Sequence, residues 1–111
     1  MNTLLTQMGN RIYTRRKQLH LTQDALAERA NVTPQMISSA ELGKKALRPE
    51  NIIKICSALD ISTDYLLTGN VTDKDYSSLI QKIEKLTPTQ YRCLEEIIHS
   101  FLKALYEENI N

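Results

Sequence analysis

The chain has no tryptophan, a single phenylalanine and, among its 111 residues, two cysteines. A disulfide-stapled domain needs more cysteine than this. Cys56 and Cys93 both fall within apolar helical patterns, so we expect reduced thiols in the core. His20 and His99 are far apart in the sequence, and without a cluster of Cys and His ligands no metal site is expected. The composition therefore does not favour a disulfide scaffold or a zinc domain.

Long apolar runs are missing as well. No run approaches the roughly 20 residues that cross a bilayer, and residues 1–5 lack the basic segment and apolar core of a secretory signal. We therefore expect a cytoplasmic protein without a membrane segment. Gly-rich phosphate loops, paired carboxylates and metal-ligand spacings are also missing, and no acid or cysteine is patterned around His99. The sequence does not predict an enzyme, and no cofactor is expected.

The chain has an ordinary globular composition with an uneven distribution of charge. It is 41% apolar and 24% charged, and its net charge of +1 hides a basic first half. Residues 1–49 hold eight Lys and Arg against three Asp and Glu, whereas residues 71–111 hold five against seven. This asymmetry suggests a polyanion-facing surface in one part of the chain, although ordinary solvated charge would give the same counts.

Helical periodicity dominates, and no run of alternating β-branched residues indicates a sheet, so we predict an all-α fold. Residues 1–69 are expected to form one domain of five helices. Polar N-cap residues begin three of them, and Pro34 and Pro49 stand where a first-turn proline costs no hydrogen bond. The expected segments are 4–17, 22–31, 33–43, a helix that follows Arg48-Pro49 with Ile52, Ile53, Ile55, Cys56 and Leu59 as its apolar side, and 62–67.

A second helical element is predicted after a short linker. Residues 70–75 are polar and indicate the linker, and residues 76–111 contain two further helical patterns, which we expect to form a hairpin. The second pattern opens with the capping sequence Thr-Pro-Thr-Gln at 87–90. Apolar residues then recur at intervals of three and four, which is typical of a packing seam. The seam consists of Tyr91, Leu94, Ile98, Phe101 and Leu105, widened by Ile97 and Leu102.

The most informative stretch runs from Leu19 to Gly43. Only the tripeptide Asn-Val-Thr at 31–33 separates two helical segments, and the small residues Ala27 and Ala30 stand where a crossing helix must come close. This pattern is typical of a helix-turn-helix, whose second helix enters the DNA major groove with its N-terminal residues. A chance pair of helices with a short turn is also common in all-α proteins, so spacing alone does not decide between the two interpretations.

Several dispersed motifs strengthen the helix-turn-helix interpretation. They are Leu-Thr-Gln-x-x-Leu-Ala at 21–27, Ile-Ser at 37–38, Glu-x-Gly-Lys at 41–44 and Leu-Asp-Ile-Ser-Thr-Asp-Tyr-Leu-Leu-Thr-Gly at 59–69. Together they resemble the Cro/repressor type of helix-turn-helix protein, also called the XRE family, over residues 4–69. The resemblance implies a five-helix, lambda-repressor-like domain that binds double-stranded operator DNA, usually as a two-fold dimer.

The resemblance also implies residues that contact DNA. Gln35 is our first choice for base readout, because a glutamine amide can bind adenine N6 and N7 together; the alternative is a plain exposed helix residue. Gln23 stands at a helix N-terminus, which favours anions. The candidate base contacts are Thr33, Pro34, Gln35, Ser38 and Ser39. The candidate phosphate contacts are Gln23, Lys44, Lys45, Arg48, Arg11 and Arg15.

Four further positions carry expectations from the family pattern. Arg16 and Glu41 match a pair in which an arginine of the first helix bridges to the acid that ends the third, which we interpret as structural. Ala40 stands where a bulkier apolar residue is common, so we expect a looser contact with the core there. Leu42 stands where arginine is frequent, so we expect an exposed apolar side chain and one phosphate contact fewer.

We therefore expect a sequence-specific transcriptional regulator, most simply a homodimeric repressor that reads a palindromic operator. The seam at residues 91–105 must bury against something, because an isolated helix of this length is marginal in water. It either pairs with its copy in a dimer or packs on its own N-terminal domain. An alternative from another class is a protein-interaction adaptor or antitoxin-type regulator, whose C-terminal helices bind a partner protein.

Overall fold

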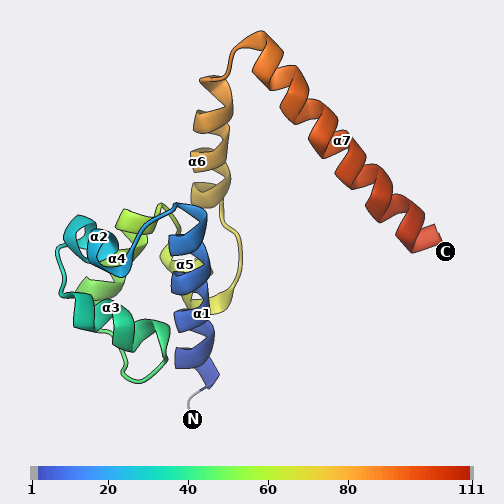
Figure 1. Cartoon of the computed structure of the whole chain (residues 1–111). Coiled ribbons are helices and arrows are strands. Elements are labelled where there is room, and N and C mark those ends of the chain that lie inside the picture. The colour runs from blue at the N-terminus through green and yellow to red at the C-terminus, as the bar shows by residue number, and fades with distance from the viewer. Residues whose placement is uncertain (1–2, 111) are drawn as a thin grey trace. The chain divides into compact units, whose positions relative to one another are not determined.

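The computed structural model describes residues 3–110, and this part of the chain is all-helical, as predicted. Seven helices follow one another in it (Figure 1). They divide into two compact units, of which unit 1 ends at Tyr76 and unit 2 begins at Ser77. The helices are α1 (Thr3–Gln18), α2 (Gln23–Ala30), α3 (Pro34–Glu41), α4 (Pro49–Leu59), α5 (Thr63–Thr68), α6 (Asp73–Glu84) and α7 (Pro88–Ile110).

Side-chain caps begin helices α2, α3 and α5 where the sequence predicts them. The hydroxyls of Thr22, Thr33 and Ser62 accept hydrogen bonds from main-chain N–H groups three residues further on, at 3.0, 3.2 and 2.9 Å. Each bond satisfies a donor that has no partner within the first turn of its helix. At the end of α2, Asn31 takes the left-handed conformation, with φ of 57°. The turn between α2 and α3 is therefore capped on both sides.

Unit 1 is built around one apolar core. In it α1 packs on α3, α4 and α5, while α2 packs on α3 and α4. The most deeply buried large side chains are Ile12, Leu26, Ile37, Ile55, Cys56, Leu59 and Leu66. Burial raises the pKa of the Cys56 thiol to about 11, so this free thiol stays protonated at neutral pH.

Two expectations about buried side chains were wrong. Ile53 was expected on the apolar side of its helix but is 61% exposed, because α4 turns Ile52, Ile55 and Leu59 toward the core instead. Cys93 was expected in a core but is exposed on α7, a helix with an apolar face that stays uncovered in this structure. Both errors come from counting apolar residues without knowing which face of the helix has a neighbour.

The main chains of α1 and α3 come close together at Gly9. A Cβ atom at this position would lie 2.5 Å from the main-chain oxygens of both Ala40 and Glu41, so only glycine fits without a shift. Ala40 is 4% exposed, and its small side chain matches the close approach. The expected looser contact at Ala40 was therefore wrong, because small residues on both helices bring the two main chains together. Gly9 is thus one of the residues that hold α3 in place.

Replacing Gly9 by alanine is expected to lower the free energy of unfolding by about 1–3 kcal/mol, because α1 and α3 must move apart. This exceeds the roughly 1 kcal/mol that alanine gains over glycine as a helix former. Asn10→Ala, on the exposed side of the same helix, is the control and should leave stability nearly unchanged. Urea unfolding followed by circular dichroism compares them, and equal midpoints for Gly9→Ala and wild type would contradict the steric argument.

Helix α6 begins earlier than the sequence analysis placed it. Residues 73–75 were assigned to the linker, but they form the first turn of α6. The Asp75 carboxylate accepts hydrogen bonds from the Thr72 main-chain N–H at 2.9 Å and from the Thr72 hydroxyl at 3.1 Å. Thr-x-x-Asp is a helix-start signal in its own right, so this boundary could have been predicted.

Unit 2 contains the rest of α6 and the whole of α7. The predicted capping box is confirmed, since Thr87 and Gln90 exchange hydrogen bonds of 2.9 and 3.2 Å. Both helices of the expected hairpin are present, but within the described residues they do not pack extensively on one another. The predicted seam residues of α7 are 41–66% exposed, apart from the half-buried Leu94. No helix within residues 3–110 has both the length and the apolarity needed to cross a membrane.

Candidate nucleic-acid interface

Helix α3 presents a polar face that begins at its N-terminal end. Ile37 and Ala40 point to the core and orient the helix. The five candidate base contacts all reach the surface, Thr33, Pro34 and Gln35 being exposed and Ser38 and Ser39 half-buried. The first turn is therefore the most accessible part of α3, and a recognition helix inserts this end into the major groove.

A groove of about 330 Å³ joins this face of α3 to the loop that follows the helix. Its lining includes three candidate base contacts and two candidate phosphate contacts, namely Thr33, Gln35, Ser39, Lys45 and Arg48. The structure thus places hydrogen-bonding side chains of α3 beside cations of the loop. Asn51, in the first turn of α4, also lines the groove. Asn51 was not among the candidate residues, because only the fold brings the first turn of α4 to this groove.

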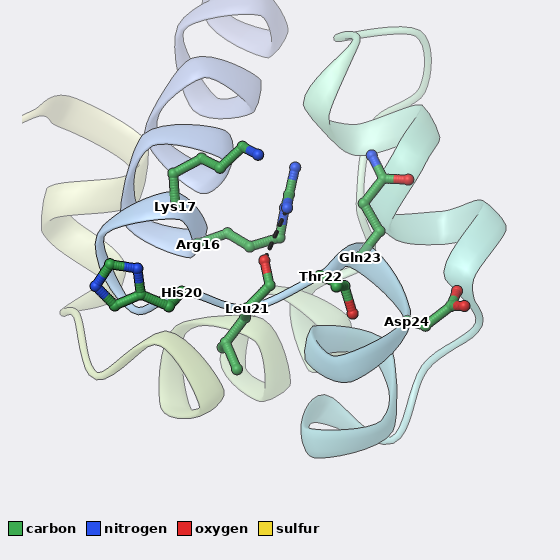
Figure 2. A pocket seen from close by; sticks show the side chains of 7 residues that line it. All are labelled: Arg16, Lys17, His20, Leu21, Thr22, Gln23 and Asp24. Carbon is green, nitrogen blue, oxygen red and sulfur yellow. Dashed lines mark hydrogen bonds between the residues drawn. The ribbon is translucent and has the colours of Figure 1, made fainter.

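A buried carboxylate joins three helix ends behind the polar face. Glu41 Oε2 accepts a hydrogen bond from Arg16 Nε at 2.6 Å, and Glu41 Oε1 accepts one from Arg16 Nη2 at 3.0 Å. The two side chains are only 5% and 7% exposed. Arg16 Nη1 donates a third bond to the Leu21 carbonyl at 2.8 Å, drawn as a dashed line in Figure 2. The end of α3 is therefore tied to α1 and to the turn before α2.

The same carboxylate orients Gln23. Gln23 Nε2 donates a hydrogen bond to Glu41 Oε1 at 3.1 Å. Because a carboxylate only accepts hydrogen bonds, the NH₂ group of Gln23 must face Glu41, and its second N–H can still donate elsewhere. The hydrogen bond to Glu41 raises the pKa of Arg16 more than burial lowers it, so the guanidinium stays charged. Arg16, Glu41 and Gln23 form a fixed group, which we call the lock.

Gln23 borders a hollow of about 570 Å³ at the start of α2. Figure 2 shows the Lys17 ammonium and the Gln23 amide on either side of the Arg16 guanidinium. His20, in the left-handed conformation with φ of 58°, and Asp24 line the hollow as well. The helix N-terminus and Lys17 favour an anion here, whereas Asp24 opposes it and Arg16 is already paired with Glu41. Lys17 was not among our candidates, although it closes the basic run Arg-Arg-Lys.

Arg11 and Arg15 serve a different purpose in the structure from the other basic candidates. Arg11 Nη1 donates to the Leu66 carbonyl at 2.9 Å, near the end of α5, and Arg15 Nε donates to the Leu59 carbonyl at 2.9 Å, at the end of α4. Terminal carbonyls of a helix lack intrahelical partners, so these bonds stabilise both helix ends. Lys44, Lys45 and Arg48 are instead exposed. Phosphate contacts from Arg11 and Arg15 remain predictions.

Comparison with known proteins shows which proteins this chain is similar to. A helix-turn-helix family model matches residues 12–66. The repressor protein C2 of Salmonella phage P22 is 40% identical over 72 residues, which cover 65% of this chain and 32% of the phage protein. The cryptic phage CTXphi transcriptional repressor RstR, from Vibrio cholerae serotype O1, is 27% identical over 98 residues, which cover 86% of this chain and 88% of that repressor.

A solved structure matches the same region. The crystal structure of the P22 c2 repressor in complex with a synthetic operator aligns with 57% of this chain and 96% of that chain, at 40% identity and a TM-score of 0.55. This chain spans about a third of the full C2 protein, so only the shared domain is compared. The matched residues include α2, the capped turn and α3. The chain therefore belongs to the helix-turn-helix family of DNA-binding transcriptional regulators, of the Cro/repressor (XRE) type.

Proposed function

We propose that this protein is a sequence-specific transcriptional repressor that binds a palindromic DNA operator as a homodimer. The observation that carries the proposal is the groove between α3 and the following loop, where base-reading and phosphate-binding side chains lie side by side. Base contacts specify a site, whereas phosphate contacts hold the protein in register on the duplex. The groove of unit 1 offers both kinds of contact.

Base readout is assigned to the exposed residues of α3. Gln35 projects from the first turn and has the donor and acceptor that adenine requires. Ser38 and Ser39 are shorter and partly buried, and a serine hydroxyl can bind any base, so they add less specificity. Thr33 has its hydroxyl engaged as the N-cap of α3. Pro34 can offer only apolar contact, for example to a thymine methyl group.

Phosphate binding is assigned to two places on unit 1. The exposed cations Lys45 and Arg48 line the groove, and the exposed Lys44 precedes Lys45 in the same loop. Gln23 stands at the N-terminus of α2, and the lock leaves one of its amide N–H bonds available to a phosphate oxygen. The P22 protein is named a repressor and was crystallised with a synthetic operator, which supports DNA binding by the shared domain.

The homodimer is assigned to the exposed apolar face of α7. Two-fold DNA-binding proteins place their recognition helices roughly 34 Å apart, in successive major grooves, and so read palindromic sites. A large exposed apolar face on a soluble chain marks an interaction surface. The match to the repressor RstR covers 86% of this chain. A match of that length must extend into α7. A second copy of the chain is the simplest occupant of the face.

The proposal is tested by selecting bound duplexes from a random DNA pool at about 150 mM salt and sequencing them. Enrichment of a palindrome is the expected result. Gln35→Ala should then lose its preference at one base of each half-site and bind the selected operator roughly 10- to 100-fold more weakly. The control is Gln81→Ala, an exposed glutamine on α6.

An unenriched pool for wild-type protein would overturn the proposal. It would favour the adaptor or antitoxin-type alternative, in which the fold serves protein contacts. The exposed α7 face and Leu42, which is 59% exposed, are the surfaces available for such a partner. If wild type enriches a palindrome and Gln35→Ala has the same base preferences, the proposed function stands but Gln35 does not read a base.

A further inference from the structure

The Asp75 carboxylate gathers four hydrogen bonds where unit 1 ends. Asp75 Oδ1 accepts from the Ser62 main-chain N–H at 2.8 Å, and Oδ2 accepts from the Ser62 hydroxyl at 2.7 Å. Oδ2 also accepts from the N–H and the hydroxyl of Thr72, at 2.9 and 3.1 Å. Hydrogen bonds to an ionised acceptor are among the stronger ones in proteins. One side chain thus joins the start of α5 to the start of α6.

Ser62 and two helix ends around the carboxylate stabilise this contact. Ser62 is 5% exposed, and its hydroxyl also caps α5 by accepting from the Tyr65 N–H at 2.9 Å. The carboxylate lies at the N-terminal ends of two helices, where negative charge is favoured. Burial by itself raises the pKa of Asp75, but the hydrogen bonds from Thr72 and Ser62 outweigh it, and the pKa lies below its usual value. The contact therefore holds in its charged form at neutral pH.

Asp75 lies close to the boundary between the two units. It lies in the first turn of α6, and the boundary between the units, after Tyr76, falls inside the same helix. Without the contact, the side-chain bonds from Asp75 to Ser62 are lost, and the short segment 69–72, which includes Gly69, carries more of the connection between α5 and α6. With the contact, the first turn of α6 is held on the start of α5 by the Asp75 carboxylate.

We propose that Asp75 is a positioning residue for operator binding: it fixes the start of α6 on unit 1 and thereby sets the spacing of half-sites that the dimer accepts. This inference rests on the proposed function. A dimer whose DNA-binding units are held in a set orientation binds one spacing well, because both recognition helices engage at a high effective concentration. A dimer with loosely tethered units binds more weakly and tolerates several spacings.

The test compares full-length wild type with Asp75→Ala on the selected operator and on operators lengthened or shortened by one base pair at the centre. Wild type should lose about tenfold or more in affinity when the spacing changes. Asp75→Ala should bind the original operator about tenfold more weakly and distinguish the three spacings by less than about threefold. The control is Asp73→Ala, which removes an exposed acid from the same turn of α6 without removing the contact.

The outcomes separate this inference from the proposed function. Asp75→Ala with the spacing preference of wild type would overturn the role of Asp75 and leave the repressor assignment intact. Wild type that selects no operator would overturn the proposed function itself. Sedimentation and circular dichroism establish that each variant is a folded dimer. If Asp75→Ala does not fold, Asp75→Asn replaces it, because it keeps the shape of the side chain and loses the charge that holds four donors.

Discussion

Replacing Glu41 by alanine is expected to destabilise unit 1 by about 3–5 kcal/mol. The reason is that the replacement removes the carboxylate that pairs with Arg16. The Arg16 side chain is 7% exposed and keeps its hydrogen bond to the Leu21 carbonyl and its contact with the Tyr13 ring, but the buried charge loses its counter-ion. Gln23 loses its acceptor at the same time. Since small domains are stable by roughly 5–15 kcal/mol, a large share of the total is at risk.

Urea unfolding of the full chain measures this loss, and the chain offers a matched control. Arg92 and Glu95 also form an ion pair, at 2.8 Å, but their side chains are 73% and 50% exposed. Exposed pairs contribute little to stability because water screens them, so Glu95→Ala should unfold at nearly the wild-type midpoint. Equal losses for Glu41→Ala and Glu95→Ala would contradict the claim that burial makes the lock costly to break.

A double replacement separates the stability of the lock from its role in binding. Changing both members of a buried ion pair to apolar residues of similar volume is often neutral for stability. Arg16→Met with Glu41→Leu should therefore fold, while leaving Gln23 without the carboxylate that orients its amide. We expect weaker operator binding from this folded variant. Wild-type affinity would mean that Gln23 needs no orientation by the lock.

The helices of unit 1 could largely be predicted because local signals and tertiary packing agree there. Thr22, Thr33 and Ser62 cap their helices as expected, and Asn31 and Gly69 end theirs in the left-handed conformation. Capping depends on residues within one turn, so the sequence contains the whole signal. Ile53 shows the limit of such reasoning, since an apolar residue beside the apolar face of a helix is buried only if a neighbour reaches it.

Features that depend on distant segments could not be predicted from the residues alone. The close approach at Gly9 appears only when α1 meets the end of α3. The bonds of Arg11 and Arg15 to helix-terminal carbonyls require α4 and α5 to be in place, and these arginines look like any other basic residues in the sequence. The pairing of Arg16 with Glu41 was expected only from the resemblance to the Cro/repressor family. No spacing rule links residues 25 positions apart.

Replacing Phe101 by aspartate is expected to convert the proposed dimer into monomers and to weaken operator binding by about 100-fold or more. Phe101 is 62% exposed in the single chain, so the change should not unfold unit 1. In a dimer the same position would bury an unpaired carboxylate, which is strongly unfavourable. Linking two half-site contacts in one molecule is worth roughly 10²- to 10⁴-fold in affinity, and monomers lose that gain.

Sedimentation and operator titration test this prediction together, with Ser100→Asp as the control. Ser100 is exposed on the same helix, one residue away and outside the seam, so it receives the same charge without touching the apolar face. It should remain a dimer with wild-type affinity. If Phe101→Asp is still a dimer, the interface lies elsewhere on the chain. Monomeric wild type would mean that the seam packs within its own chain or awaits a different partner, because a face this apolar does not stay uncovered in water without cost.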